Sequence, residues 1–268
     1  MDDGVYRRIL LDGAGSNLLQ VRQLREDALH LRIGGAHPER WRETACAMVG
    51  VEADVADWCR RIEPFPWLAR LAQRLRGLRP PRYPSLWEAL AHAIVFQQIS
   101  IHAAAAIMRR AVERLSEAHE VEGRRLHPFF TPSDVLYAPD DALRGAGLSA
   151  NKIDHLRSAA AAIEDGELHE VALAPLSSEE AALKLQTVRG IGPWSAAVVL
   201  LRGLGRLDVF PLEDSGVACA LRELSGHPDL DAAALLQALG PVRGFLYYHL
   251  LLGRMRNLAP GAGDSGNA

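Results

Sequence analysis

Two glycines, a proline, a tryptophan and a later aspartate form the pattern with the most chemical content in this sequence. Gly190 and Gly192 precede Pro193 between two apolar segments that are typical of helices. Glycine permits positive φ angles and leaves main-chain N–H groups uncovered, and proline suits the first turn of a helix. Several N–H groups at a helix start form an anion site, and phosphate is the expected anion. Asp214 follows Trp194 by twenty residues, in a loop before another apolar segment.

Each of these features also has a purely structural interpretation. A glycine-containing turn between helices is common, and an aspartate before an apolar segment is typical of a helix N-cap. The whole string is more specific, because LQTVRGIGPWSA is followed by DVFPLED. Hairpin, tryptophan and downstream aspartate in this order resemble the helix-hairpin-helix (HhH-GPD) DNA glycosylase superfamily, and most closely its DNA-3-methyladenine glycosylase II branch. The resemblance covers about residues 80–255 well and residues 1–80 loosely.

The resemblance implies a DNA glycosylase, which flips a damaged base out of the duplex and hydrolyses its N-glycosidic bond. Positive charge develops on the deoxyribose in the transition state, and a nearby carboxylate stabilises it and orients the attacking water. Asp214 occupies the position of the family's catalytic aspartate. Glu213 is the neighbouring alternative, but the register of DVFP favours Asp214.

The residue at position 194 bears on whether the DNA strand is also cut. In superfamily members with lyase activity, a lysine at this position of the hairpin forms a Schiff base. Here the residue is Trp194, and the chain has only two lysines. No motif ties the helix of Lys152 to the cleft, and Lys184 precedes the turn by about six residues, roughly 9 Å along a helix, too far to reach the sugar. An indole suits an electron-poor alkylated purine through cation–π attraction, although Trp194 as an ordinary core residue is the alternative.

We therefore expect a monofunctional glycosylase that excises alkylated purines of the 3-methyladenine type in base excision repair. Two alternatives stay open. One is an enzyme of the same fold that acts on an oxidised or deaminated base. The other is a non-catalytic DNA-binding protein that uses the hairpin only to hold phosphate.

Two glutamines and the C-terminal segment extend the resemblance. Gln97 and Gln98 in AIVFQQIS match a Gly-Gln-Gln segment of the family, although Phe96 stands where glycine is frequent. Gln97 would line the base pocket and Gln98 would fill the gap left by the flipped nucleotide; two solvated glutamines at a helix end are the alternative. The segment GPVRGFLYYHLLL resembles the closing helix of the family, with Leu251 in place of its aromatic residue.

The resemblance thus implies three sets of site residues beyond Asp214. The base pocket would be lined by Trp194, Gln97, Val198, Ser215, Leu251 and Tyr247. DNA would be contacted by Gly190, Gly192, Ser195, Gln98 and Arg243. A monovalent cation, Na⁺ or K⁺, would be held by the main-chain carbonyls of Gln186, Val188 and Ile191.

The composition indicates the broad class of protein. The chain has 268 residues, 49% of them hydrophobic and 24% charged, which is typical of a globular protein with a large core. No apolar run approaches the ~20 residues that span a bilayer, and the N-terminus lacks a secretory pattern. We expect a cytoplasmic monomer, associated with the nucleoid if bacterial, with no membrane partner and with damaged double-stranded DNA as its partner.

The number of cysteines limits which cofactors the chain can bind, and the charge distribution limits how it can bind nucleic acid. Three scattered cysteines, Cys46, Cys59 and Cys219, exclude the four-cysteine iron–sulfur loop of the endonuclease III branch, so no cofactor is expected to be required. The net charge is −3, which argues against a strongly basic nucleic-acid coat. Residues 181–256 hold eight basic and six acidic residues, a local balance of +2 that permits a DNA-binding face.

The hydrophobic pattern predicts a mostly α protein, α+β overall, with the helix-hairpin-helix glycosylase fold. Short apolar or alternating runs at 5–11, 18–24 and 28–33 predict a small antiparallel sheet, which looks shortened beside the N-terminal domain of the resembled family. A capping box at Ser85–Glu88 opens a nearly all-helical region. The expected domains are an N-terminal α+β domain at 1–80, a helical glycosylase region at 81–258 with its hairpin at 178–204, and a disordered tail at 259–268.

Overall fold

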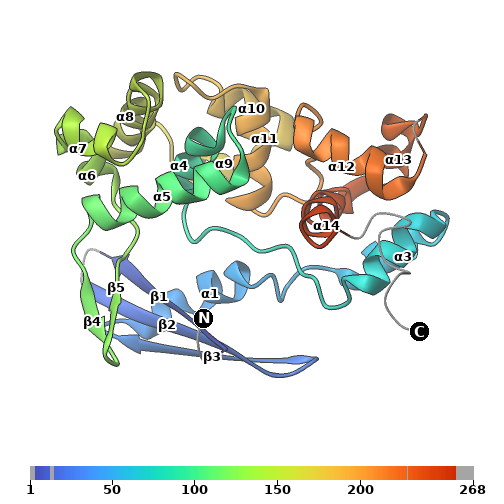
Figure 1. Cartoon of the computed structure of the whole chain (residues 1–268), viewed down its shortest axis with the longest axis horizontal. Helices are drawn as coiled ribbons and strands as arrows, with labels where there is room; N and C mark the ends of the chain where they lie inside the picture. Colours follow the sequence, from blue (N-terminus) through green and yellow to red (C-terminus); the bar gives the residue numbers. More distant parts are fainter. Residues whose placement is uncertain (1–3, 13–14, 228, 258–268) are drawn as a thin grey trace.

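An antiparallel sheet forms the lower layer of the molecule in Figure 1. The structure, a computed structural model, describes residues 4–12, 15–227 and 229–257. The sheet has the order β1-β2-β3, with β1 (Val5–Asp12), β2 (Gly15–Arg25) and β3 (Ala28–Gly35). The predicted three-stranded antiparallel sheet is thereby confirmed. The predicted tail at 259–268 lies outside the described residues.

One face of the sheet carries a small core of its own. Alternate side chains of β2 point to this face, so Leu19 and Val21 are buried there together with Leu10 of β1. The 3₁₀ turn η1 (Pro38–Trp41) and the helix α1 (Arg42–Met48) follow β3 and cover this face. The sheet therefore needs little from the rest of the chain to bury its apolar residues.

A larger core holds the first group of helices. Ser85 begins this group by accepting the N–H of Glu88 through its side chain. The shared core is built around buried residues such as Leu90, Leu156 and Leu200. Its elements are α4 (Leu86–Phe96), α5 (Ile101–Leu115), α6 (Pro132–Tyr137), α7 (Asp140–Gly145), α8 (Ala150–Glu164), α9 (Glu170–Leu173), α10 (Ser178–Leu185) and α11 (Pro193–Arg202).

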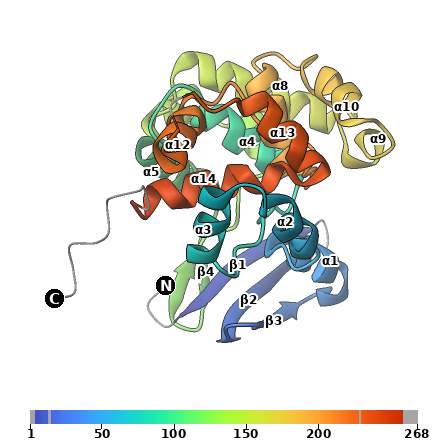
Figure 2. The same cartoon turned by 90° about the vertical axis from the view of Figure 1, so that its right-hand side faces the viewer.

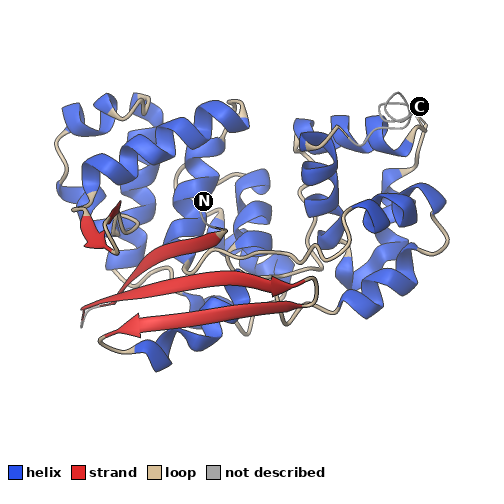
Figure 3. Cartoon of the chain, turned by 60° about the horizontal axis from the view of Figure 1, so that its bottom comes forward, coloured by secondary structure: helices blue, strands red, loops and turns tan. Residues whose placement is uncertain are grey.

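A second group of helices joins the two ends of the chain. Trp58 of α2 stacks on Phe245 of α14 with 5.3 Å between ring centroids. Figure 2 shows the early helices directly below the late ones, and Figure 3 shows the two helical groups side by side. The elements of this group are α2 (Val55–Ile62), α3 (Pro66–Arg74), α12 (Ser215–Ser225), α13 (Ala232–Leu239), η2 (Gly240–Val242) and α14 (Gly244–Met255). The domain boundary near Pro80 stays a prediction, but packing places α2 and α3 with the C-terminal helices.

A short β-hairpin, which the sequence pattern did not predict, ties the helices to the sheet. It consists of β4 (His119–Val121) and β5 (Arg124–Leu126). Glu122 at its turn has a φ of +50°. The carboxylate of Glu122 accepts hydrogen bonds from Arg7 of β1 at 3.0 Å and from Gln20 of β2 at 3.1 Å. Polar strands of three residues carry too weak an alternation to be recognised from sequence.

The expected capping box at the start of α4 is only half present. Ser85 accepts the N–H of Glu88, but the carboxylate of Glu88 pairs with Arg8 of β1 instead of turning back to the helix start. Glu88 is buried and Arg8 is partly buried, between β1 and α4; burial raises the pKa of Glu88, while the charge of Arg8 opposes the shift. None of the described helices combines the length and the apolar character that a membrane crossing requires.

Candidate active site

The hairpin of helices α10 and α11 is built as the sequence pattern predicts. A capping box of Ser177 and Glu180 begins α10, and the buried Val188 and Ile191 anchor the turn in the first core. Gly192 is the N-cap of α11, and no side chain caps this helix. The N–H groups of its first turn are therefore left for an external acceptor, which the positive end of the helix dipole favours as an anion.

The two hairpin glycines have different structural roles. Gly190 has a φ of +89°, and a Cβ atom there would lie 2.2 Å from the ring of His155. Glycine is thus required at 190 by the packing of the turn on α8. At Gly192, in contrast, a Cβ atom would meet nothing within 4 Å. The open side of Gly192 allows close approach by a ligand.

Asp214 lies at the start of α12, and its carboxylate accepts two hydrogen bonds. Its Oδ1 accepts the N–H of Val217 at 3.0 Å, which is the bond of a helix N-cap. Its Oδ2 accepts the indole N–H of Trp194 at 2.9 Å. The N-cap role and a carboxylate beside the hairpin are therefore properties of one side chain. Because Trp194 packs against the first core and α12 belongs to the second, the bond also spans the two helical groups.

The flanking residues of Asp214 differ in exposure. Glu213 and Ser215 are both exposed, and neither makes a described hydrogen bond. Tyr247 of α14 is buried and close enough to Asp214 to sense its charge: burial raises the pKa of Tyr247, and the carboxylate of Asp214 adds to the rise. Asp214 thus lies between the exposed residues Glu213 and Ser215 and the buried phenol of Tyr247.

The remaining base-pocket candidates lie in the two cores. Val198 is buried in the core of the first helical group. Leu251 is partly buried against the second, one turn along α14 from Tyr247. The structure brings Trp194 and Tyr247 to Asp214, whereas Val198 and Leu251 have no described contact with it. Their assignment to the base pocket stays a prediction.

Gln97 contacts the hairpin, and Gln98 protrudes from the surface. The amide of Gln97 donates to the carbonyl oxygen of Gly190 and to Oγ of Ser195, both at 2.8 Å. Gln98 is exposed and has a φ of +56°, which is rare outside glycine. Ile99 beside it is also exposed, at 37%. The loop after α4 therefore combines a side chain tied to the hairpin with two that project outward.

Two residues that the sequence analysis did not place in the site lie beneath it. Lys152 of α8 donates to the carbonyl oxygen of Gln97 at 3.0 Å and also to that of Val95. His155, one helical turn later, packs against Gly190. The sequence offered no motif that connects α8 with the hairpin, and the structure shows the connection through these contacts. No motif could reveal these contacts, because they join residues of separate segments, 55 and 57 positions apart for Lys152 with Gln97 and Val95.

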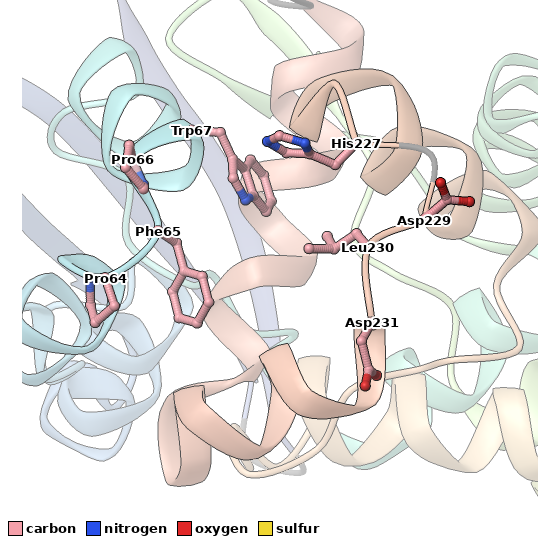
Figure 4. A pocket seen from close by; sticks show the side chains of 8 residues that line it. All are labelled: Pro64, Phe65, Pro66, Trp67, His227, Asp229, Leu230 and Asp231. Atoms are coloured by element: carbon pink, nitrogen blue, oxygen red, sulfur yellow. The ribbon is translucent and has the colours of Figure 1, made fainter.

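Arg243 and the described cavities lie apart from this constellation. Arg243 donates through Nε to the carbonyl oxygen of Gly240 in its own turn. One cavity, of about 470 Å³, lies between the start of α3 and the loop before α13 (Figure 4). Another, of about 360 Å³, lies between β1, α4 and α5. Neither is lined by Asp214 or Trp194, so the candidate site rests on the contacts of its residues.

Comparison with known proteins shows likenesses in both sequence and structure. Residues 91–240, more than half of the chain, match the model of the family described as HhH-GPD superfamily base excision DNA repair protein. The DNA-3-methyladenine glycosylase of Bacillus subtilis (strain 168) is 24% identical over 241 residues, which cover 86% of this chain and 80% of that protein.

Solved structures show the same architecture. The 3-methyladenine DNA-glycosylase from Archaeoglobus fulgidus superimposes with a TM-score of 0.80 at 25% identity, over 96% of this chain and 89% of that one. An 8-oxoguanine glycosylase/lyase from Clostridium acetobutylicum, in complex with double-stranded DNA, has a TM-score of 0.74 at 18% identity, over 93% and 88% of the two chains. At 18% identity, the likeness to the 8-oxoguanine glycosylase/lyase is one of fold alone.

Proposed function

The chain belongs to the HhH-GPD superfamily of base excision DNA repair proteins, and on that premise we propose that it is a monofunctional glycosylase for alkylated purines of the 3-methyladenine type. Its relatives named DNA-3-methyladenine glycosylase make it an enzyme that hydrolyses N-glycosyl bonds in damaged DNA. The finer proposal, the lesion and the absence of strand cleavage, is supported chiefly by one contact. That contact is the hydrogen bond between Trp194 and Asp214.

The contact supports hydrolysis through a positioned carboxylate. Two donors, the Val217 N–H and the Trp194 indole, hold both oxygens of Asp214, so the carboxylate has one orientation. A fixed negative charge stabilises the positive charge that develops on the deoxyribose and orients the attacking water. The uncapped first turn of α11 is available for a phosphate of the same strand.

The same contact argues against lyase chemistry. An indole cannot form an imine with the C1′ of the sugar, so position 194 offers no covalent route. Of the two lysines, Lys152 is engaged by the carbonyls of Val95 and Gln97. Lys184 is exposed on α10, before the turn. We expect base removal to leave the strand intact.

The face of Trp194 supports an alkylated base as substrate. Alkylation leaves a purine electron-poor or cationic, and indole is the side chain with the strongest attraction for cations. An oxidised base is the second candidate, because the fold is shared with an 8-oxoguanine glycosylase/lyase. A third candidate, DNA binding without catalysis, would leave Asp214 with only its structural role as the N-cap of α12.

A panel of duplexes tests these alternatives. Single-turnover excision is measured on otherwise identical duplexes that carry 3-methyladenine, 7-methylguanine, ethenoadenine, 8-oxoguanine or hypoxanthine. We expect release of the methylated purines. Release of 8-oxoguanine or hypoxanthine instead would replace the proposed lesion. Tight binding of the panel without release would support the non-catalytic alternative.

Borohydride trapping on the same duplexes tests the monofunctional assignment. We expect no covalent protein–DNA adduct during turnover, and strand breaks only after alkali or heat. An adduct formed by wild-type protein and lost in Lys184→Ala or Lys152→Ala would make the enzyme bifunctional. The two variants name the amine responsible.

We also propose a Na⁺ or K⁺ ion at the carbonyls of Gln186, Val188 and Ile191. A set of main-chain oxygens suits a hard cation, and the Val188 carbonyl keeps a lone pair beyond the N–H of Ile191 that it accepts at 3.1 Å. The ion would draw the carbonyls of the turn together. We further propose that the enzyme acts as a monomer in the cytoplasm, with no other cofactor.

A further inference from the structure

Helix α4 ends in a turn that its own backbone does not satisfy. The last carbonyl groups of a helix have no partner within the helix. After Phe96 the chain leaves α4 through Gln97 to Ser100 before α5 begins. The ammonium group of Lys152 accounts for two of these carbonyls, since it donates to the oxygens of Val95 and Gln97. This lysine is thus the C-terminal cap of α4, supplied by α8.

The turn that Lys152 caps has a backbone conformation that needs support. Gln98 has a φ of +56°, a left-handed conformation that is costly for a residue other than glycine. Such a conformation persists where the surrounding contacts fix it. The Gln97 carbonyl, immediately before Gln98, is held by Lys152 at 3.0 Å. The donor therefore acts on the peptide group that sets the direction of the Gln98 side chain.

The same region of α8 also supports the hairpin. The ring of His155 packs against Gly190, one helical turn from Lys152. The Gln97 amide closes the arrangement by donating to the Gly190 carbonyl and to Ser195. Lys152, His155 and Gln97 together thus connect the protruding loop after α4 with the hairpin turn.

We propose that Lys152 is a positioning residue that holds Gln98 and Ile99 in the orientation in which they enter the duplex. The inference rests on the proposed function, because it assigns the loop a role in opening the base stack. Lys152 is partly buried, and this burial lowers the pKa of its amine, which agrees with a donor to backbone carbonyls. Glutamine and isoleucine side chains that occupy the gap would stabilise the DNA with its base flipped out.

The first test observes the loop in DNA directly and does not depend on the lesion. A duplex carries a tetrahydrofuran abasic analogue, with 2-aminopurine on the opposite strand facing it. Insertion of the loop unstacks the reporter, so wild-type protein raises its fluorescence on binding. Lys152→Met should bind this duplex within about threefold of wild type, since the hairpin contacts to phosphate remain, and should lose most of the rise.

Two matched variants complete the set. Lys184→Met removes the other lysine of the chain from an exposed position and should behave as wild type. Lys152→Arg keeps a multiple donor and should restore most of the fluorescence rise. A full rise in Lys152→Met, or no rise in the wild-type protein, would overturn the proposal.

Excision rates provide the second test. The same lesion is placed opposite its normal partner or opposite an abasic analogue, where little pairing has to be broken. For Lys152→Met we expect a loss of about 10- to 100-fold on the paired lesion, the size of effect that a displacement of about 1 Å can have, and a much smaller loss on the unpaired one. Equal losses on both duplexes would indicate general damage and contradict the positioning role. If wild-type protein excises no lesion, the proposed function fails, while the fluorescence result still decides the role of Lys152.

Discussion

At the scale of single residues, Asp214 performs two tasks that sequence reasoning treats as alternatives. An aspartate before a helix is typical of an N-cap, and here Oδ1 has that role toward Val217. Oδ2 is still available to the site, where the indole of Trp194 orients it. The N-cap bond therefore fixes the position of the carboxylate and is compatible with the catalytic role that we propose for it.

Asp214→Asn separates the charge from the cap. Asparagine is as good an N-cap as aspartate, so the melting temperature should change little. Base release should fall by at least ~100-fold, because a positioned charge-stabilising group is lost and an amide N–H₂ has to face the indole N–H. Single-turnover excision and binding to an abasic analogue are the measurements, and binding should largely survive.

Glu213→Gln is the control for this substitution. Glu213 is exposed and makes no described hydrogen bond, so its variant should excise at the wild-type rate. If the Asp214 variant were as active as the Glu213 variant, the catalytic assignment would be wrong.

Sequence alone could propose Asp214 and Trp194 as neighbouring site residues, since both lie in contiguous motifs with a fixed order, and the structure shows them hydrogen-bonded to each other. It could not identify Lys152 or His155, whose roles depend on how α8 packs under the loop after α4 and the hairpin. The direction of the Gln97 amide, toward Gly190 and Ser195, likewise follows from the packing of two helices.

At the scale of elements, the hairpin turn makes different demands on its two glycines. Gly190 has a positive φ and no room for a Cβ atom beside His155, whereas Gly192 has an ordinary φ of −91° and open space. Gly190 is therefore required by the packing of the turn, whereas Gly192 leaves space in which a ligand can approach the turn. The sequence pattern GIG predicts both as contacts to phosphate and cannot tell them apart.

Gly192→Thr uses this difference. Threonine is β-branched and favoured at an N-cap, so the fold should be as stable as wild type or slightly more stable. Its side chain would occupy N–H groups of α11 and stand in the path of a phosphate. Affinity for DNA should fall with or without a lesion, and the slope of log K against log salt should decrease by about one contact.

Gly190→Ala is the complementary variant. Its Cβ would lie 2.2 Å from His155 in a left-handed conformation, so unfolding in urea should show a loss of about 1–3 kcal/mol. Unchanged DNA affinity of a stable Gly192→Thr protein would leave the hairpin as a structural turn only.

Periodicity predicted most elements because it reports which residues are buried. The runs at 5–11, 18–24 and 28–33 agree with β1 to β3 within three residues at each end. Periodicity does not report the partner of a buried face. Trp58 and Ile62 mark α2 as amphipathic, yet only the structure shows that they pack against the C-terminal helices and not against the sheet.

At the scale of the whole molecule, several ionisable groups lie in the interior. His92 stacks on Tyr83 with 4.2 Å between ring centroids and accompanies the buried pair of Glu88 and Arg8. Burial lowers the pKa of His92 to about 3. Such burial could not be predicted, because the residues that exclude water come from distant segments.

His249 is the simplest of these groups and leads to a prediction about acid stability. It is 2% exposed, its ring packs at a tilt against Trp58 with 4.8 Å between centroids, and its Nδ1 lies 2.8 Å from the carbonyl oxygen of Phe245. Burial lowers its pKa to about 4, while the unfolded chain has a histidine pKa of about 6.5. The unfolded state therefore binds the proton first as pH falls. The stability that neutral His249 contributes is present above pH 6.5 and is lost as the pH approaches 4.

The variant His249→Phe isolates this contribution, because phenylalanine fills a similar volume beside Trp58 and does not titrate. Between pH 7 and pH 5 the wild-type protein should lose about 2 kcal/mol more of its free energy of unfolding than the variant does. Urea unfolding followed by tryptophan fluorescence at the two pH values measures the difference. His102→Asn, at an exposed position, should retain the wild-type pH dependence. If wild type and His249→Phe lost the same free energy of unfolding between pH 7 and pH 5, His249 would have the same pKa in the folded and unfolded states. The interior around Trp58 would then have to admit water.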